Sequence, residues 1–179
     1  MRRAAVLPLL LLCAQAPAAD RTALDQLYDA LRQAPDEAIA GRIEEQIRAQ
    51  WLTQATPATA LLFTRGLHEM QNDATPDAID DFSAAIDLQP DFAEAFTERA
   101  QARFAEGDYA GAVDDIGASL GADPRHFDAL DALSRFAESR NDWKGAYAAW
   151  RKLMEIDPKT PGGADRLNDL RRRALGENA

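Results

Sequence analysis

The amino-acid sequence predicts an all-α protein in which three pairs of helices stack into a solenoid. The first observation is a period of 34 residues, marked by prolines that each follow a helix-like segment: Pro90, Pro124 and Pro158. The second is that small and bulky residues recur at matching positions of each period. The third is that apolar residues within each half-period follow helical spacing. A fixed period of this length is typical of helical solenoids.

Small and bulky residues form fixed columns when the three units are aligned on their prolines. The first helix of each unit carries Gly66, Ala100 and Ser134, and the second carries Ala78, Ala112 and Ala146, followed by Phe82, Ile116 and Trp150. A side chain no larger than alanine lets two helix axes approach closely, and a bulky residue fills the space alongside. We therefore expect these columns to lie where paired helices meet.

Capping residues indicate where the helices of the middle unit begin. Asp91, with Glu94 three positions later, is typical of a capping box at the start of the first helix. Gly107 is expected to end that helix near Ala105, and Asp108 to cap the second helix. The equivalent starts of the second helix in units one and three are Thr75-Pro76 and Asn141-Asp142.

Amphipathic segments on both sides of the units are expected to close the ends of the stack. Residues 20–56 are expected to form two capping helices that pack on the first unit. Each has one apolar stripe: Leu24, Leu27, Tyr28 and Leu31, then Ile39, Ile43, Ile47 and Trp51. Residues 161–176 are expected to form a polar capping helix with Leu167 and Leu170 facing inward, because a solenoid needs a wettable terminal helix.

The repeats resemble the tetratricopeptide repeat (TPR) family. The matching features are the small residue of the first helix, the alanine and bulky residue of the second, and the closing proline. They recur in three consecutive units, 59–92, 93–126 and 127–160. The resemblance implies a right-handed α-solenoid with a concave groove lined mainly by the first helix of each pair, here called helix A. Where the family usually has tryptophan near the start of helix A, this sequence has Leu62, Phe96 and Leu130.

The resemblance also places three residues of each helix A in the groove: Phe63, Leu67, Met70, Thr97, Gln101, Phe104, Asp131, Arg135 and Glu138. The first set is apolar, the second mixed and the third charged, which would suit a peptide with apolar anchors at one end and polar groups at the other. The alternative is that the capping helices cover the first set. Some family members grip a C-terminal carboxylate with lysine and asparagine, but the corresponding positions here are Phe63, Leu67, Gln101 and Asp131.

Charge at two further positions appears and disappears together. Helix A carries Arg65 and Arg99 in units one and two, where the family usually has leucine, and the second helix carries Asp81 and Asp115. In unit three both positions are uncharged: Leu133 and Ala149. We expect partly buried arginine–aspartate bridges between paired helices or across to a neighbouring unit. The alternative is that Arg65 and Arg99 bind an anion.

Composition excludes several classes of function. Acidic residues outnumber basic ones 30 to 20, for a net charge of −10, which argues against binding nucleic acid. At 46% hydrophobic residues the chain is too apolar to be disordered. One cysteine excludes a disulfide scaffold, and two histidines leave little for a metal site. We expect His68 and His126 to be surface or packing residues.

The sequence contains no motif of known reaction chemistry. It lacks a glycine-rich phosphate loop, a nucleophile elbow and a zinc-binding helix pattern. In each of the acid pairs 80–81 and 114–115, the two side chains point about 100° apart on a helix, so they do not face one substrate together. The sequence therefore predicts a non-catalytic adaptor, without metal or cofactor, that binds a protein or peptide. A self-associating structural module that forms a homo-oligomer and an accessory subunit of an envelope complex remain alternatives.

Residues 1–18 are expected to be a secretory signal peptide. Arg2 and Arg3 form a basic start, an apolar stretch follows at 4–14, and Ala16-Pro17-Ala18 is a small-residue cleavage pattern. The apolar run is shorter than the roughly 20 residues of a membrane-spanning helix. Cleavage near Ala18 would remove Cys13 and leave no membrane span. The resemblance and the signal together imply an exported TPR protein of the bacterial periplasm.

Overall fold

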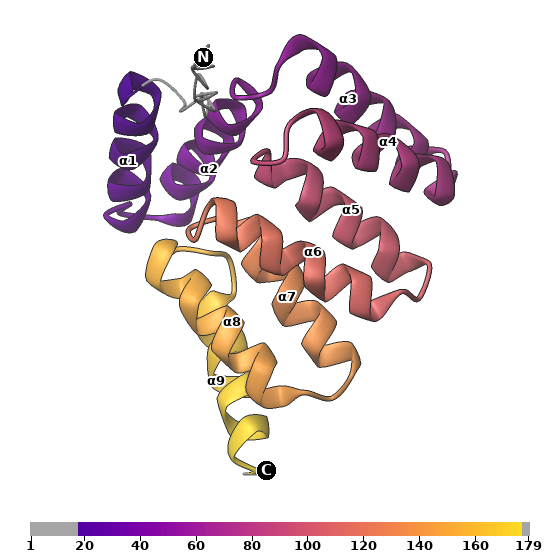
Figure 1. Ribbon diagram of the computed structural model, residues 1–179. Helices are drawn as coiled ribbons and strands as arrows, with labels where there is room; N and C mark the ends of the chain where they lie inside the picture. Colours follow the sequence, from indigo (N-terminus) through magenta and orange to yellow (C-terminus); the bar gives the residue numbers. More distant parts are fainter. Residues whose placement is uncertain (1–17, 177–179) are drawn as a thin grey trace, which may run out of the picture.

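The computed structural model describes residues 18–176 and confirms the all-α prediction. Within that range the chain forms nine helices and no strand (Figure 1). They are α1 (Ala18–Arg32), α2 (Glu37–Leu52), α3 (Pro57–Gln71), α4 (Thr75–Leu88), α5 (Ala93–Ala105), α6 (Tyr109–Ala122), α7 (Phe127–Ser139), α8 (Trp143–Ile156) and α9 (Gly163–Leu175). Apart from Ala18, the segment expected to be a signal peptide lies outside the described residues.

Helices α3 to α8 form three consecutive pairs, and the pairs stack on one another. The paired helices are α3 with α4, α5 with α6, and α7 with α8, while α5 packs on α4 and α7 packs on α6 (Figure 1). Helix α9 packs on α8 as the first helix of a further pair would. The helices α3, α5 and α7 are therefore the A helices of the three units, and the structure is a solenoid closed at its C-terminal end by α9.

The small columns lie where the two helices of a pair meet. Ala78, Ala112 and Ala146 are completely buried, as are the bulky Phe82 and Ile116 of the next turn. A Cβ atom at Gly66 would lie 2.6 Å from Cε1 of Phe82, so the Phe82 ring of α4 fills the space that a larger residue at position 66 would need. The 34-residue repeat is thus a repeat of helix-to-helix contact.

The turn inside each pair repeats its backbone conformation. Asp73, Gly107 and Asn141 all adopt positive φ, at 58°, 83° and 58°. In each case the next residue donates its N–H to a carbonyl of the preceding helix A at 2.9 Å, which ends that helix in the same way in every unit. Glycine is needed in none of these turns, but Gly107 adopts this conformation without a Cβ penalty.

The start of α5 differs from the expected capping box. Phe92 is the N-cap residue, and no side chain caps the helix. Glu94 instead lies with its carboxylate 2.9 Å from the ring of His126, so it cannot turn back to the start of its own helix. Asp108 and Asp142 cap α6 and α8 as expected, each accepting a backbone N–H three residues on at 3.0 Å.

Helices α1 and α2 form a pair, here called the N-terminal hairpin, which does not cap the first unit as expected. It packs instead on units two and three, where Trp51 stacks on the His126 ring at 4.1 Å between centroids. Tyr28 donates a 2.7 Å hydrogen bond to Asp123. The apolar stripes of the N-terminal hairpin share one core with α7, α8 and α9. These contacts hold the hairpin against units two and three.

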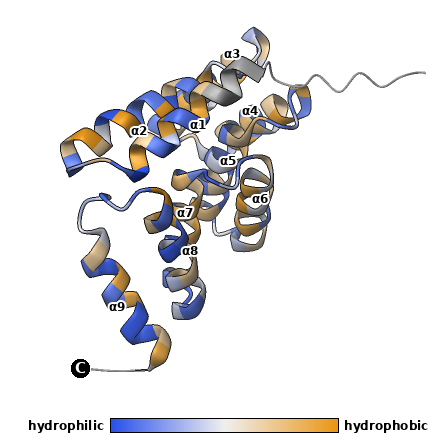
Figure 2. Cartoon of the chain, turned by 90° about the vertical axis from the view of Figure 1, so that its left-hand side faces the viewer, coloured by the Kyte–Doolittle hydropathy of each residue, from blue (hydrophilic) through white to orange (hydrophobic). Residues whose placement is uncertain are grey.

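The leading face of α3 is consequently uncovered. Leu61 is 72% exposed, whereas the residues at the same repeat position, Ala95 and Ala129, are completely buried under the preceding unit. At the other end, α9 buries Leu170 against the core and presents a largely hydrophilic surface (Figure 2). Within the described residues no helix is long and apolar enough to cross a membrane.

Candidate functional site

Two of the nine residues predicted to line the groove are core residues. The ring of Phe63 packs on Phe82 and Phe92, with centroids 5.7 and 5.3 Å away. Thr97 is fully buried, and its hydroxyl lies 2.8 Å from that of Ser119. Neither side chain is available to a partner. The N-terminal hairpin does not account for this burial, because the residues that cover them come from the repeats themselves.

Four more predicted groove residues are half-buried. Leu67 and Met70 pack against the aromatic cluster that contains Phe63. The Phe104 ring stacks on Phe136 at 4.2 Å and 10°, so it joins units two and three. Gln101 makes no side-chain hydrogen bond to any residue that the structure describes, which leaves its amide available on α5.

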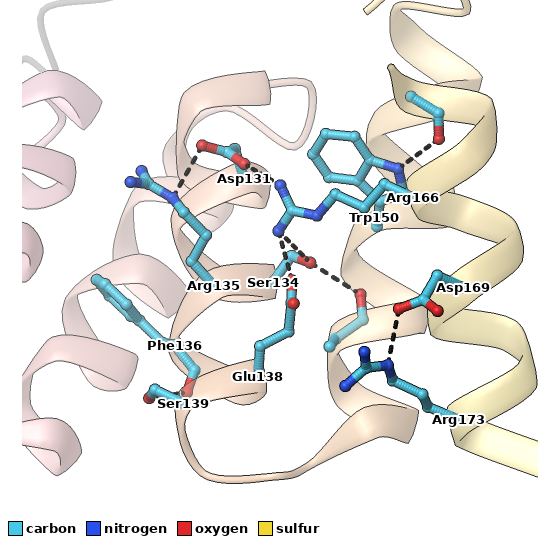
Figure 3. Close-up of polar contacts among 12 residues, drawn as sticks. Asp131, Ser134, Arg135, Phe136, Glu138, Ser139, Trp150, Arg166, Asp169 and Arg173 are labelled. Atoms are coloured by element: carbon cyan, nitrogen blue, oxygen red, sulfur yellow. Dashed lines mark hydrogen bonds and ion pairs between the residues drawn. The ribbon is translucent and has the colours of Figure 1, made fainter. Parts of the chain in front are cut away.

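The charged end of the predicted groove is largely occupied by the C-terminal helix (Figure 3). Arg166 of α9 donates to Asp131 at 3.2 Å and to Glu138 at 2.6 Å. Its guanidinium lies 4.0 Å from the centre of the Trp150 ring. Arg135 is exposed and pairs with Asp131 at 3.0 Å. Of this set, only Arg135 therefore presents much of its side chain to solvent.

The structure brings together the two arginine–aspartate pairs. Arg99 contacts both oxygens of Asp115, at 2.9 and 2.7 Å, and also donates to Ser83 of the preceding unit at 3.0 Å. Arg65 makes the same two-point contact with Asp81. The side chain of Arg99 is 14% exposed and that of Arg65 58%, because no earlier helix covers α3. These contacts hold both guanidinium groups against carboxylates, so neither is poised to bind an anion.

A pocket of about 540 Å³ lies between the N-terminal hairpin and the first turns of units two and three. We call it the hairpin pocket. It is lined by Leu24, Asp25, Trp51, Gln54, Asp91, Phe92, Ala93, Glu94, Ala122, Asp123, Pro124 and Arg125. Pockets of roughly 300 to 1,000 Å³ commonly hold small ligands, so this one has room for one or two side chains of a peptide.

The ionisable residues that line the hairpin pocket are mainly acidic. They are Asp25, Asp91, Glu94, Asp123 and Arg125. The guanidinium of Arg125 is bound to Asp25 and lies 4.0 Å from the centre of the Tyr28 ring. Asp123 already accepts hydrogen bonds from Tyr28 and from the backbone of Arg125. Asp91 is exposed and takes part in no ion pair within the described part of the chain.

The wall of the pocket contains a buried histidine. His126 is fully buried, its Nδ1 accepts the Ala129 N–H at 3.3 Å, and its Nε2 lies 2.9 Å from Glu94. Burial by itself lowers the pKa of His126, but the carboxylates of Glu94, Asp128 and Asp123 outweigh it and raise that pKa above its ordinary value. The predicted role of His126 as a packing residue agrees with this position, whereas His68 is exposed and contacts Asn72.

Glu98 lies one turn beyond Glu94 on α5. Burial, together with the charges of Glu94 and Asp128, raises the pKa of Glu98 to about 7, although His126 and Arg135 act in the opposite direction. This carboxyl is therefore close to half-ionised at neutral pH. Within residues 18–176 no group of three acidic, histidine or cysteine side chains has the arrangement to hold a metal ion.

Sequence reasoning missed the hairpin pocket and the role of Arg166. The pocket joins hairpin residues to repeat residues about 40 to 100 positions later in the chain, and the repeat pattern contains no information on such pairs. One signal was present: Trp51 ends the apolar stripe of its helix, and a large aromatic residue there needs a partner. Arg166 lies beyond the last unit, so the alignment of units gave it no partner on α7.

Helix pairs that repeat every 34 residues, with small residues at their contacts, define an α-helical repeat fold with the architecture of tetratricopeptide repeats. No family model matches the chain. The chain is similar to a TPR repeat-containing protein of Rhizobium etli, with 29% identity over 153 residues, which covers 86% of this chain and 75% of that protein.

Solved TPR domains share the fold. The Sgt2 TPR domain of Aspergillus fumigatus superimposes with a TM-score of 0.62 and 24% identity, covering 68% of this chain and 82% of that one. The first TPR of Spaghetti (RPAP3), bound to the HSP90 peptide SRMEEVD, has a TM-score of 0.61 and 18% identity. The match covers 66% of this chain and 94% of that one. The TPR2B domain of yeast Sti1, in complex with pHsp70, has a TM-score of 0.60 and 16% identity. The match covers 69% of this chain and 100% of that one. With the repeats of the sequence, these likenesses show that the chain has the TPR fold.

Proposed function

We propose that this protein is a non-catalytic adaptor that binds a segment of a partner protein. The observation that carries the proposal is the hairpin pocket, a peptide-sized hollow with apolar walls and free polar groups at the first turns of units two and three. Solved domains of the same fold hold peptides, as the RPAP3 domain does with SRMEEVD. Asp25, Glu94, Asp123 and Arg125 are engaged in ion pairs and hydrogen bonds, and among the described residues the pocket lining contains no serine, threonine, cysteine or lysine that could act as a nucleophile.

The A helices would extend this site. Gln101 on α5 has a free amide, and Arg135 on α7 is exposed, so both are available to a bound segment. The apolar first set is not, because Phe63 is buried. We propose a contact surface that runs from the hairpin pocket to Gln101 and Arg135, shorter than the groove predicted from the sequence.

Filling the pocket tests the adaptor function. Ala122 is exposed and lines the pocket, so Ala122→Trp places a large ring inside it. Ala118→Trp on the same helix is the matched control, because Ala118 is exposed and lies outside the pocket. In pull-downs from bacterial envelope extract quantified by mass spectrometry, we expect specific partners to be lost with Ala122→Trp and retained with Ala118→Trp. Identical partner sets for the two variants would refute the pocket as the binding site.

We further propose that the protein acts in the bacterial periplasm. The proposal is supported by the basic, apolar and small-residue segments of residues 1–18, in the order of a secretory signal. Export would remove the single cysteine, so that the stability of the protein rests on helix packing.

Self-association is a second candidate function, favoured by the uncovered face of α3. Leu61 and Arg65 are exposed there, whereas the next two units bury the same face against a preceding helix. A second copy of the chain could cover it. Light scattering across a range of concentrations tests this, because a mass that stays at one chain at high concentration excludes self-association as the main function.

A further inference from the structure

We infer that the hairpin pocket receives a basic side chain, lysine or arginine, of the bound segment. The inference rests on the proposed function, because it names the chemistry that the adaptor recognises at that site. It depends on the charge of the pocket lining, on polar atoms in its wall that lack hydrogen bonds, and on its apolar walls.

Charge complementarity favours a cation. Four carboxylates line the pocket against one guanidinium, that of Arg125, which Asp25 binds and the Tyr28 ring covers. The side chain of Asp91 remains without an ionic partner in the described range. A negative ligand would face this excess of like charge in a partly enclosed space, where screening by water is reduced.

Two buried polar atoms in the wall also lack hydrogen bonds. Glu94 is 8% exposed and Trp51 3% exposed, and among the described residues no hydrogen bond reaches Glu94 Oε1 or Trp51 Nε1. The Nε2 atom of His126 lies 2.9 Å from Glu94 Oε1 and forms an ion pair with it when His126 is protonated, so of the two atoms only Trp51 Nε1 is without a polar partner among the described residues. Buried groups of this kind normally have partners. The main chain of the bound segment offers a carbonyl to the indole, and a basic side chain offers N–H groups to the carboxylates that line the pocket.

The apolar walls suit the stem of such a side chain. Leu24, Trp51 and Phe92 supply apolar surface in the same lining as the carboxylates. Lysine and arginine bury their methylene stems on apolar surface while the charged head reaches polar groups. The uncapped start of α5 also lies in this lining, and a helix start favours anions. A helix dipole equals only about half an elementary charge, however, so the four carboxylates outweigh it.

Short peptides test the inference directly. The ¹⁵N-labelled protein is titrated with acetyl-Gly-Arg-Gly-amide and, separately, with peptides in which neutral citrulline or glutamate replaces arginine. The readout is the indole N–H resonance of Trp51 and the backbone amides of Ala93 and Glu94. We expect saturable shifts with arginine and about fivefold weaker binding of citrulline, as for the loss of one partly exposed charge contact. Equal binding of arginine and citrulline, stronger binding of glutamate, or no saturable shift would overturn the inference.

Charge reversal at the pocket mouth supplies the matched variants. Asp91→Lys should abolish binding of the arginine peptide, whereas Asp80→Lys, which reverses an exposed charge on α4, should leave it unchanged. Glu94→Gln should also weaken binding, and Asp91→Lys remains informative if that buried change prevents folding. If Ala122→Trp loses partner proteins but the peptides show no preference for arginine, the adaptor function would stand and this inference would fall. If the arginine peptide binds but no partner is lost with Ala122→Trp, the inference would stand and the adaptor function at this pocket would fall.

Discussion

Arg48 of the N-terminal hairpin forms a two-point ion pair with Asp128 of α7, 80 positions later in the chain. Its Nε and Nη2 atoms each lie 2.9 Å from one carboxylate oxygen, and Glu44 accepts a further bond at 3.0 Å. The guanidinium also lies 4.9 Å from the centre of the Phe127 ring. This contact holds the hairpin, which supplies one side of the hairpin pocket, at the start of unit three.

The Arg48–Asp128 pair should contribute modestly to stability. Because the arginine side chain is 41% exposed, we expect a coupling energy of about 0.5–1 kcal/mol between Arg48→Ala and Asp128→Ala. Chemical denaturation of both single variants and the double variant measures it. A coupling energy of zero would show that packing of Trp51 and Tyr28, rather than this pair, holds the hairpin.

The Arg99–Asp115 pair should matter more, because it is buried between helices. Arg99→Leu leaves Asp115 with Arg103 alone, at 3.0 Å, and we expect a loss of about 2–3 kcal/mol, less than for a wholly uncompensated charge. Adding Asp115→Ala should recover much of that loss. Arg65→Leu is the control with a smaller expected effect, because Arg65 is largely exposed. Losses that simply add in the Arg99 and Asp115 double variant would contradict the bridge.

Stability should fall as the pH rises through neutrality. Glu98 has an ordinary pKa of 4.5 and a pKa of about 7 in the folded state, so the folded state holds the proton more tightly. The contribution of Glu98 to the free energy of unfolding is complete below pH 4.5 and is lost as the pH rises to about 7. The raised pKa of His126 acts in the same direction above its ordinary value of 6.5.

Glu98→Gln isolates the carboxyl contribution to that pH dependence. We expect the variant to gain about 1–3 kcal/mol relative to the parent between pH 5 and pH 8, since a pKa shift of one unit corresponds to about 1.4 kcal/mol. Urea denaturation at the two pH values measures the gain. Glu106→Gln, an exposed change at the end of α5, is the control. Parallel pH curves for Glu98→Gln and the parent would refute the assignment.

Substitutions at one repeat position should affect the free energy of unfolding much less in unit one than in unit two. Leu61→Ala should change the free energy of unfolding by less than about 0.5 kcal/mol, because this side chain is 72% exposed. Ala95→Leu, at the same position of unit two, should cost about 1–3 kcal/mol, because it overfills a completely buried site. A large loss for Leu61→Ala that grows with protein concentration would instead support a self-associated form.

Export predicts a defined new N-terminus. Protein recovered from the periplasmic fraction of an expressing bacterium should begin at Ala19, after the Ala16-Pro17-Ala18 pattern. N-terminal sequencing and intact mass measurement show this directly. Replacing Ala16 and Ala18 with bulky residues should block cleavage. A cytoplasmic protein that retains Met1 would contradict both the signal and the proposed location.

The repeated units could be predicted in detail, and the surroundings of the candidate site could not. The small columns were visible because Ala78, Ala112 and Ala146 are completely buried at the same position of each unit. Phe63 was expected in the groove by resemblance to the TPR family, yet Phe82 and Phe92 bury it. A family pattern gives the face of a helix, whereas the size of the neighbouring side chains decides its exposure.

By itself the sequence determined the helices, their pairing and the order of the stack, because those depend on apolar periodicity and on contacts that recur every 34 residues. Only the tertiary structure decided where the N-terminal hairpin and α9 lie, and therefore which A-helix residues remain free. Trp51 finds His126 and Arg166 finds Glu138 through single side-chain contacts between distant segments. Such contacts occur once in the chain, so no periodicity records them.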